Sequence, residues 1–327
     1  MVDDRGALIG HDGGVAEFLE ALDSGKLHHA WLLTGQHGIG KALFALHASA
    51  VLLSQAKSAL TMPLFRDALS TPAARQMLQG SHPDFRHIQP AKDKATQIIS
   101  VDQIRTLAGL FQTTAGMGGW RIAIIDAADD MNRAAANAIL KLLEEPPPRS
   151  VFFLISHTPG KLLPTIRSRC RTLRFQPLAN EDVAAVLASS APEAQDDMDA
   201  VLAFADGSPG RALSYLEGHA LDYSSTLAGL FDSLPHIDRR TLLGLADQMG
   251  DRASSPVYKT CWSLLQDMAT YAVRSSASGD GVYKDISTNR WLAFADGLEE
   301  GRRQIEGLNM SPRQALIALV SHLAPPA

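Results

Sequence analysis

The stretch GQHGIGKA, Gly35–Ala42, stands between a short apolar run and a run rich in alanine and leucine. Its spacing, G-x-x-x-x-G-K, is that of a phosphate-binding loop. Glycines let several backbone N–H groups surround a phosphate, and the following helix adds its positive end. The residues of this predicted site are Gly35, Gly38, Gly40 and Lys41. An alternative interpretation of the same stretch is a glycine-rich turn from strand to helix with an exposed lysine.

Two side chains that a hydrolytic site needs are missing. The residue after the lysine of such a loop is a serine or threonine whose hydroxyl holds magnesium, and here it is Ala42. Asp126 ends the apolar stretch RIAIID, where it would position magnesium through its water shell, unless it caps a helix instead. The glutamate that would orient the attacking water is replaced by Ala127. We predict a degenerate site that can hold ATP or ADP but hydrolyses it very slowly, and its occupancy stays open.

Composition and charge exclude several classes of protein. The chain has 327 residues, 46% hydrophobic and 20% charged, which suffices for two or three domains with substantial cores. The net charge of −5 argues against a free-standing nucleic-acid-binding protein, but leaves DNA contact within a larger assembly open. Two cysteines make neither a disulfide framework nor a cysteine-rich metal site. Without a signal peptide or an apolar run of membrane length, we expect a cytoplasmic protein with no membrane contact.

Apolar runs alternate with helical segments in the first half of the chain. Strands are expected at 30–34, 85–88, 121–126, 151–156 and 173–175. Helices are expected at 41–53, 101–111 and 131–145. The last of these helices is stopped by three consecutive prolines. Strands separated by helices indicate an α/β fold with a mainly parallel sheet that is covered on both faces.

The remainder of the chain is helical in character, with a break at Gly207–Gly210. We expect an α/β domain over 1–178, a small helical domain over 179–217 and a larger helical domain over 218–327. The stretch Ser275–Gly281, rich in serine and glycine, is expected to be a loop between helices. The predicted phosphate-binding loop thus belongs to the first of three domains.

Three arginines lie close together after the strand expected at 151–156. They are Arg167, Arg169 and Arg171, in and just after the stretch KLLPTIRSRC. Such a group is usually a solvated basic rim. An arginine in this kind of position can also reach a nucleotide bound by a neighbouring subunit, where its planar guanidinium stabilises the transition state better than a lysine does. Both interpretations are open on these residues alone.

Three stretches together resemble the clamp-loader branch of the AAA+ ATPases. They are LHHAWLLTGQHGIGK, IIDAADDMNRAAANAILKLLEEPP and KLLPTIRSRC. The most specific part is the helix ending at Asn137–Pro147, followed by a strand and then by Ser168-Arg169-Cys170. The resemblance covers Ile9–Phe175 by motif and the remainder by length and helical character. It implies a RecA-like AAA+ P-loop domain, a small helical lid at 179–217 and a helical collar that mediates oligomerisation.

Within that family, this chain lacks the magnesium-binding hydroxyl and the water-orienting glutamate. In this it resembles the non-hydrolysing subunit of the clamp loader of bacterial DNA polymerase III. The resemblance implies a part of the polymerase holoenzyme that works in DNA replication. Its partners would be gamma/tau and delta subunits, the sliding clamp and primer-template DNA, and Arg169 would act in trans in the ATP site of a gamma/tau subunit. One alternative is an active ATPase of the gamma/tau kind, against which Ala42 and Ala127 argue. Another is an unrelated P-loop enzyme, for which the matching motifs would be accidents.

Two features depart from the family pattern. Many relatives carry a four-cysteine zinc module after the phosphate-loop helix, whereas residues 52–85 contain no cysteine and one histidine, His82, so we predict no zinc. Relatives also place a sensing arginine fourth in Gly-Ser-x-Arg-x-Ala-Leu. Here Gly210 takes that place and Arg211 follows it, turned by about 100° on a helix. Arg211 is therefore either a nucleotide sensor or an exposed or interface arginine, and Ser156 is either a polar sensor or a cap.

Overall fold

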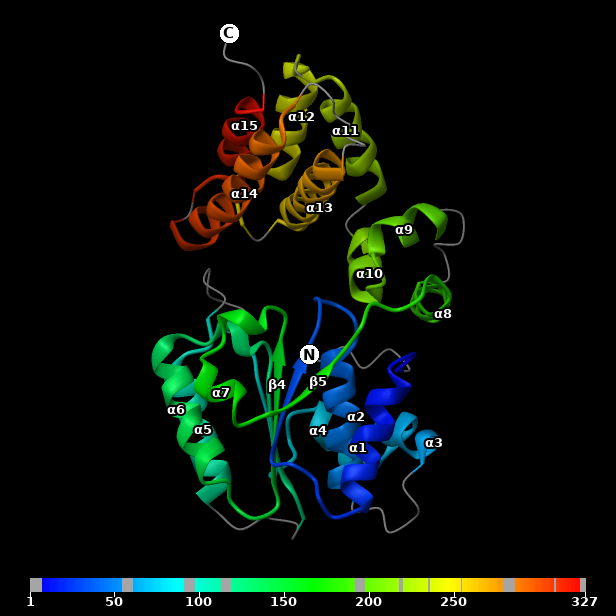
Figure 1. Cartoon of the computed structure of the whole chain (residues 1–327), viewed down its shortest axis with the longest axis vertical. Coiled ribbons are helices and arrows are strands. Elements are labelled where there is room, and N and C mark those ends of the chain that lie inside the picture. The colour runs from blue at the N-terminus through cyan, green and yellow to red at the C-terminus, as the bar shows by residue number, and fades with distance from the viewer. Residues whose placement is uncertain are drawn as a thin grey trace. The chain divides into compact units, whose positions relative to one another are not determined.

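The computed structural model describes residues 8–54, 61–90, 98–112, 119–191, 198–217, 220–234, 236–253, 255–278, 286–308 and 310–323 (Figure 1). Contacts within the chain form two compact units, of which the first ends at Ala212 and the second begins at Leu213. The first unit holds a sheet and the helices that cover it, and the second is built from helices. None of the described helices is long and apolar enough to cross a membrane.

The five strands of the first unit all run parallel, which confirms the predicted parallel sheet. They are β1 (Ala30–Thr34), β2 (Phe85–Ile88), β3 (Arg121–Ile125), β4 (Ser150–Ser156) and β5 (Arg171–Arg174). Their order in the sheet is β2-β3-β4-β1-β5. The register of β1 and β4 places Thr34 beside Ser156. Because parallel strands have their carboxyl ends at one edge, the segments that follow β1, β3 and β4 meet there.

Helices cover both faces of this sheet (Figure 1). One face carries α1 (Asp12–Asp23), α2 (Lys41–Leu53), α3 (Met62–Arg66), η1 (Ala68–Ser70) and α4 (Pro72–Leu78). The other carries α5 (Val101–Gln112), η2 (Ala128–Asp130), α6 (Arg133–Glu144), η3 (Pro159–Lys161) and α7 (Pro164–Arg167). Successive residues of β4 alternate between two cores, so that Phe153 packs with Phe18 on the first face and Phe152 with Phe111 on the second. Both faces are therefore buried, which explains the continuous apolar runs in the strands.

Three further helices follow β5, namely α8 (Asn180–Ser190), α9 (Met198–Ala205) and α10 (Pro209–Glu217). The break predicted at Gly207–Gly210 is confirmed for Gly207 and Ser208, which lie between α9 and α10, whereas Pro209 and Gly210 already belong to α10. Gly207 has a left-handed φ of 73°, and a Cβ there would lie 2.7 Å from the carbonyl oxygen of Leu178. A glycine is needed at this turn for both reasons.

The second unit contains the end of α10 together with α11 (Ala220–Asp232), α12 (Arg239–Met249), α13 (Pro256–Ser278), α14 (Thr288–Leu308) and α15 (Pro312–Ser321). The helices α13 and α14 approach closely at Gly301, where a Cβ would lie 3.0 Å from the ring of Trp262. Trp262 is buried, and its Nε1 donates to the carbonyl of Leu298 at 3.3 Å. Burying an aromatic side chain contributes about 1.5–3 kcal/mol, so this contact is a main support of the helix pair.

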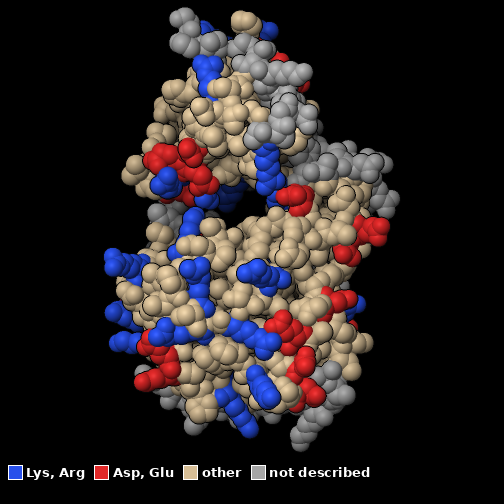
Figure 2. Space-filling model, in the orientation of Figure 1, with Lys and Arg blue, Asp and Glu red and all other residues tan. Residues whose placement is uncertain are grey.

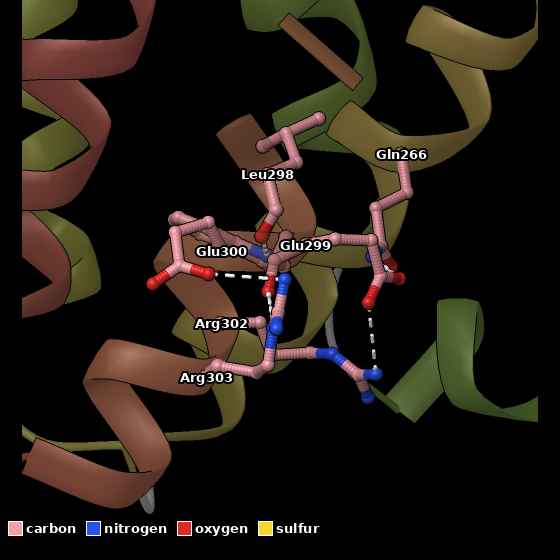
Figure 3. A network of polar contacts seen from close by, with 7 residues as sticks. Gln266, Leu298, Glu299, Glu300, Arg302 and Arg303 are labelled. Atoms are coloured by element: carbon pink, nitrogen blue, oxygen red, sulfur yellow. Dashed lines mark hydrogen bonds and ion pairs between the residues drawn. The ribbon is translucent and has the colours of Figure 1, made fainter. Parts of the chain in front are cut away.

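A row of charged side chains lies on the exposed side of α14 (Figure 3). Glu299 pairs with Arg302 at 3.4 Å and Glu300 pairs with Arg303 at 3.0 Å. Gln266 of α13 donates to Glu299 at 3.2 Å. Exposed pairs one turn apart contribute only about 0.2–0.5 kcal/mol each, so this network adds less to stability than the packing of Trp262.

Two helix boundaries differ from the predictions. The helix expected at 131–145 spans Arg133–Glu144, because the side chain of Asn132 caps it by accepting from the N–H of Ala135 at 2.8 Å. The loop predicted for Ser275–Gly281 is wrong for its first four residues, since α13 continues through Ser278. The hydroxyl of Ser276 in α13 lies 2.6 Å from the hydroxyl of Thr288 in α14. The serine side chain therefore has a hydrogen-bond partner on the next helix. Residues 279–281 lie outside the described residues.

Candidate functional site

The glycine loop between β1 and α2 has the backbone conformation that the sequence predicts. Gly35, Gly38 and Gly40 have φ values of 145°, 78° and 100°, which residues other than glycine adopt only with strain. A Cβ on Gly35 would lie 2.5 Å from the carbonyl oxygen of Phe175. The glycines are therefore required by the course of the chain as well as by any ligand.

Lys41 is folded back onto this loop. Its Nζ donates to the carbonyls of Gly35 at 2.7 Å and Gln36 at 2.6 Å, and the residue is only 3% exposed. The alternative of a turn with an exposed lysine is therefore wrong. Burial lowers the pKa of Lys41 to about 8, although the carboxylates of Asp126 and Asp129 oppose the shift. The ammonium thus keeps its proton near pH 7 and is held by the loop's own oxygens.

The residue after the lysine offers no ligand. Ala42 lies in the first turn of α2, partly buried, and its methyl group packs against the core on that face of the sheet. Ala127, which follows Asp126, is also buried. Both positions predicted to have lost a catalytic side chain are thus occupied by packed methyl groups.

Asp126 directly follows β3, at the edge of the sheet where the loop lies. Its N–H donates to the carbonyl of Ile88 at 2.9 Å, and its carboxylate accepts from Gln89 at 3.2 Å. His87 Nε2 lies 3.5 Å from the carboxylate, which is long for a hydrogen bond, so we treat it as a close electrostatic contact. Burial opposes ionisation, but these neighbours hold the pKa of Asp126 below its usual value. Asp126 is not a helix N-cap, because the short helix η2 is preceded by Ala127.

Asp129 has a role that sequence reasoning missed. Its carboxylate accepts from the Ser156 hydroxyl at 2.7 Å and from the N–H groups of His157 and Thr158. The carboxylate therefore ties η2 to the end of β4. Ser156 is fully buried and its hydroxyl is bound to Asp129. In the sequence, this role of Asp129 is indicated only by its position three residues after Asp126. Its contact with the end of β4 forms only once β3 and β4 pair, which the sequence does not show.

Two histidines complete the surroundings of Lys41. The rings of His37 and His157 lie edge to face with their centroids 4.8 Å apart. Burial and the charge of Lys41 lower the pKa of both imidazoles, to about 4 for His157. Both rings are therefore neutral near pH 7. Among the described residues, histidine, cysteine and acidic side chains form no cluster suited to a metal ion.

The start of α10 docks directly on the glycine loop. Ser208 donates from its hydroxyl to the carbonyl of His37 at 2.8 Å, and the N–H of Gly210 donates to the carbonyl of Gly38 at 2.9 Å. A Cβ on Gly210 would lie 2.7 Å from the Cα of Gly38. No side chain fits at position 210, which explains why the arginine of the family pattern is absent there. The N–H of Arg211 donates to the Ser208 hydroxyl at 3.2 Å.

The three predicted arginines do not form one group. Arg171 pairs with Glu17 of α1 at 2.8 Å, and its guanidinium lies 5.0 Å from the centre of the Trp31 ring. Arg167 is exposed at the end of α7. Arg169 makes an ion pair with Glu144 at 2.8 Å and donates to the carbonyl of Thr165 at 3.0 Å. Tertiary contacts thus draw Arg171 to a different element from Arg169.

A parallel sheet in this strand order, with a glycine loop and a buried lysine after β1 and an aspartate after β3, defines an α/β P-loop protein of the AAA+ type. A family model described as "DNA polymerase III, delta subunit" matches residues 10–179. The delta' subunit of Pseudomonas aeruginosa is 45% identical over 143 residues, which are 43% of this chain and 41% of that protein. The delta' subunit of Escherichia coli is 32% identical over 229 residues, or 69% and 66% of the two chains.

The chain therefore belongs to the family of DNA polymerase III delta' subunits. The matched regions span less than two thirds of these two relatives' own lengths. A solved structure of a gamma subunit-related protein from Thermotoga maritima aligns with 93% of this chain and 97% of its own, at 17% identity and a TM-score of 0.46.

Gly210→Ala is expected to separate α10 from the loop, because the new Cβ would meet backbone that has no flexible end to move aside. We expect the free energy of unfolding to fall by about 1–3 kcal/mol and amide exchange to speed up in a peptide covering residues 35–42. Hydrogen exchange followed by mass spectrometry measures the second effect. The matched control is Gly244→Ala in α12, where a Cβ meets nothing within 4 Å. Equal behaviour of the two variants would contradict the close contact.

Acidification is expected to destabilise the site through His157. The folded-state pKa of about 4 lies below the ordinary value of 6.5, so the unfolded chain binds the proton first and stability falls from about pH 6.5 toward pH 4. In His157→Gln this part of the pH dependence should vanish. Denaturant unfolding at pH 7.5 and 5 measures it, with the exposed His236→Gln as the control. The assignment fails if the His157 variant loses as much stability as the wild type.

Proposed function

We propose that the chain acts as the non-hydrolysing subunit of the DNA polymerase III clamp loader in DNA replication and assists a neighbouring ATPase subunit. The observation that carries this proposal is the loss of both hydrolytic side chains from an otherwise formed loop. The methyl groups of Ala42 and Ala127 are packed into the protein and can neither hold magnesium nor orient water. Phosphoryl transfer depends on such positioning, so the loop has no means of turning nucleotide over.

ATP or ADP is the ligand that this degenerate loop would take, and we expect no zinc. The backbone N–H groups of the glycine loop and Lys41 would hold the phosphates, with Asp126 nearby. Lys41 would first have to leave the two carbonyls that it now contacts. Ser156 could sense a nucleotide only through Asp129, to which its hydroxyl is bound. Arg211 stays a candidate sensor.

Arg169 is the residue by which the chain would act on its neighbour. Its side chain is 36% exposed, at the end of a short helix that leads into β5. A guanidinium presented to the γ-phosphate on another subunit stabilises the charge of the transition state without needing a catalytic site of its own. This division of labour fits a chain whose own loop lacks the hydrolytic groups.

The partners of this proposal are the gamma/tau and delta subunits, the sliding clamp and primer-template DNA. The helices of the second unit would form the collar, and Tyr271 and Leu308 there are 59% and 78% exposed and so available for subunit contacts. In the view of Figure 2, Lys and Arg outnumber Asp and Glu over the part of the first unit that carries α5, α6 and α7. A local basic surface on a chain of net charge −5 suits DNA contact that is shared with other subunits.

The second candidate function, an active ATPase of the gamma/tau kind, predicts magnesium-dependent hydrolysis by the isolated chain. We expect instead a rate no higher than that of Lys41→Ala, because neither position 42 nor position 127 carries a side-chain oxygen. Phosphate release with and without magnesium measures this. Turnover that needs both magnesium and Lys41 would establish the second candidate.

Arg169→Ala is expected to slow the neighbouring ATP site by about 10³-fold or more while the loader still assembles. DNA- and clamp-stimulated ATPase of the reconstituted loader should therefore lose that site's share of the rate. The control is Arg167→Ala, an exposed arginine two positions away. An unchanged rate in an assembled Arg169→Ala loader would leave the chain as a scaffold only. If the wild-type chain does not assemble with its partners, the clamp-loader assignment itself fails.

A further inference from the structure

Arg169 does not extend freely into solvent, because it lies against a carboxylate of its own chain. Its Nη2 lies 2.8 Å from Oε1 of Glu144, the last residue of α6. This ion pair joins the two most specific stretches of the sequence, the helix ending in LLEEPP and the Ser-Arg-Cys segment. We propose that Glu144 is a positioning residue that aims the Arg169 guanidinium at the neighbouring nucleotide, an inference that rests on the proposed function of Arg169.

The contacts fix the guanidinium in two directions. Nη2 meets Glu144 from α6, while Nη1 donates to the carbonyl of Thr165 in α7 at 3.0 Å. A guanidinium is planar, so contacts at both Nη atoms set its plane as well as its direction. These contacts use two of its five N–H donors. The remaining donors and the 36% exposure of the side chain leave room for a phosphate.

Both partners of Arg169 stand on well-anchored supports. The residue before Glu144, Leu143, is buried, and its carbonyl lies 3.0 Å from Nε2 of His29, next to β1. On the other side, Ile166 of α7 is fully buried, and its carbonyl accepts from the N–H of Arg169 at 3.1 Å. The contacts with Glu144 and Thr165 therefore hold the partly exposed guanidinium in a fixed position relative to the packed helices α6 and α7.

A carboxylate at this place needs an explanation. The carboxyl end of a helix carries partial negative charge, so an acidic side chain in the last turn is disfavoured unless a cation compensates. Arg169 is that cation for Glu144. Half-exposed ion pairs contribute little to stability, whereas a misplacement of about 1 Å in a reacting group can slow a reaction about 10²-fold. Orientation is therefore where this pair has its largest effect.

The alternatives to positioning are a purely structural pair and a carboxylate that withholds the arginine. A structural pair would support α6 and α7, and its loss would add to the loss of Arg169. A withholding carboxylate would compete with the phosphate, and its removal would raise the rate. Positioning alone predicts a lower rate that depends on Arg169 being present.

The experiment uses the reconstituted loader with wild-type chain, Glu144→Ala, Glu144→Gln, Arg169→Ala and the double variant. We expect Glu144→Ala to slow the site served by Arg169 by roughly tenfold, between no effect and the limit set by a 1 Å misplacement. It should lower kcat in stimulated hydrolysis, leave KM for ATP unchanged and remove most of the rate that Arg169→Ala removes. Glu144→Gln keeps an acceptor oxygen and should lose less. The double variant should be no slower than Arg169→Ala.

The neighbouring Glu145 provides the matched control, since it is exposed and, within the described residues, its side chain makes no hydrogen bond or ion pair. Glu145→Ala should behave as wild type, and all loaders should have the same mass by light scattering. If Arg169→Ala slows hydrolysis but Glu144→Ala does not, positioning is wrong and the proposed function stands. A faster Glu144→Ala loader, or a double variant slower than Arg169→Ala, would also overturn positioning. If Arg169→Ala itself has no effect, the proposed function fails and positioning fails with it.

Discussion

The backbones of Gly38 and Gly210 touch, and much of the candidate site follows from that contact. The N–H of Gly210 donates to the carbonyl of Gly38, and a Cβ at position 210 would lie 2.7 Å from the Cα of Gly38. The hydroxyl of Ser208 takes the neighbouring carbonyl of His37. These two hydrogen bonds thus fix the start of α10 to the loop. Any side chain at position 210 would push the start of α10 away from the loop. An arginine that senses nucleotide and a backbone contact of this kind are mutually exclusive at one position.

The positive charge of Lys41 is neutralised within the chain. The ammonium of Lys41 is held by two loop carbonyls and faces the carboxylates of Asp126 and Asp129. His37 and His157 add no positive charge near pH 7, because burial and the charge of Lys41 lower their pKa values. A triphosphate carries several negative charges and needs a surplus of positive charge or metal. The loop therefore keeps the shape of a phosphate cradle while its electrostatics are those of a satisfied protein interior.

The sequence predicted those features that depend on neighbouring residues. Apolar runs buried on both faces identified the strands, and glycine spacing identified the left-handed turns of the loop. Features that depend on distant residues escaped prediction. Asp129 binds the end of β4 only because β3 and β4 pair, and Arg171 leaves its neighbours for Glu17, which is 154 positions away. A serine-rich stretch continues as helix, and its Ser276 meets Thr288 of the next helix.

The two halves of the proposed function place the same demand, rigidity, on one unit. A loop that holds its own lysine and touches the start of α10 backbone to backbone has little freedom to respond to nucleotide. An arginine that must meet a phosphate on another subunit gains from a support that does not move, because any disorder in its position weakens its effect on the transition state. Under the proposed function, a rigid loop and an Arg169 fixed between α6 and α7 would be compatible, since rigidity would cost nothing to a chain that performs no hydrolysis of its own. On that proposal, the alanines at positions 42 and 127 and the glycine at position 210 serve one purpose, a fixed platform for an arginine.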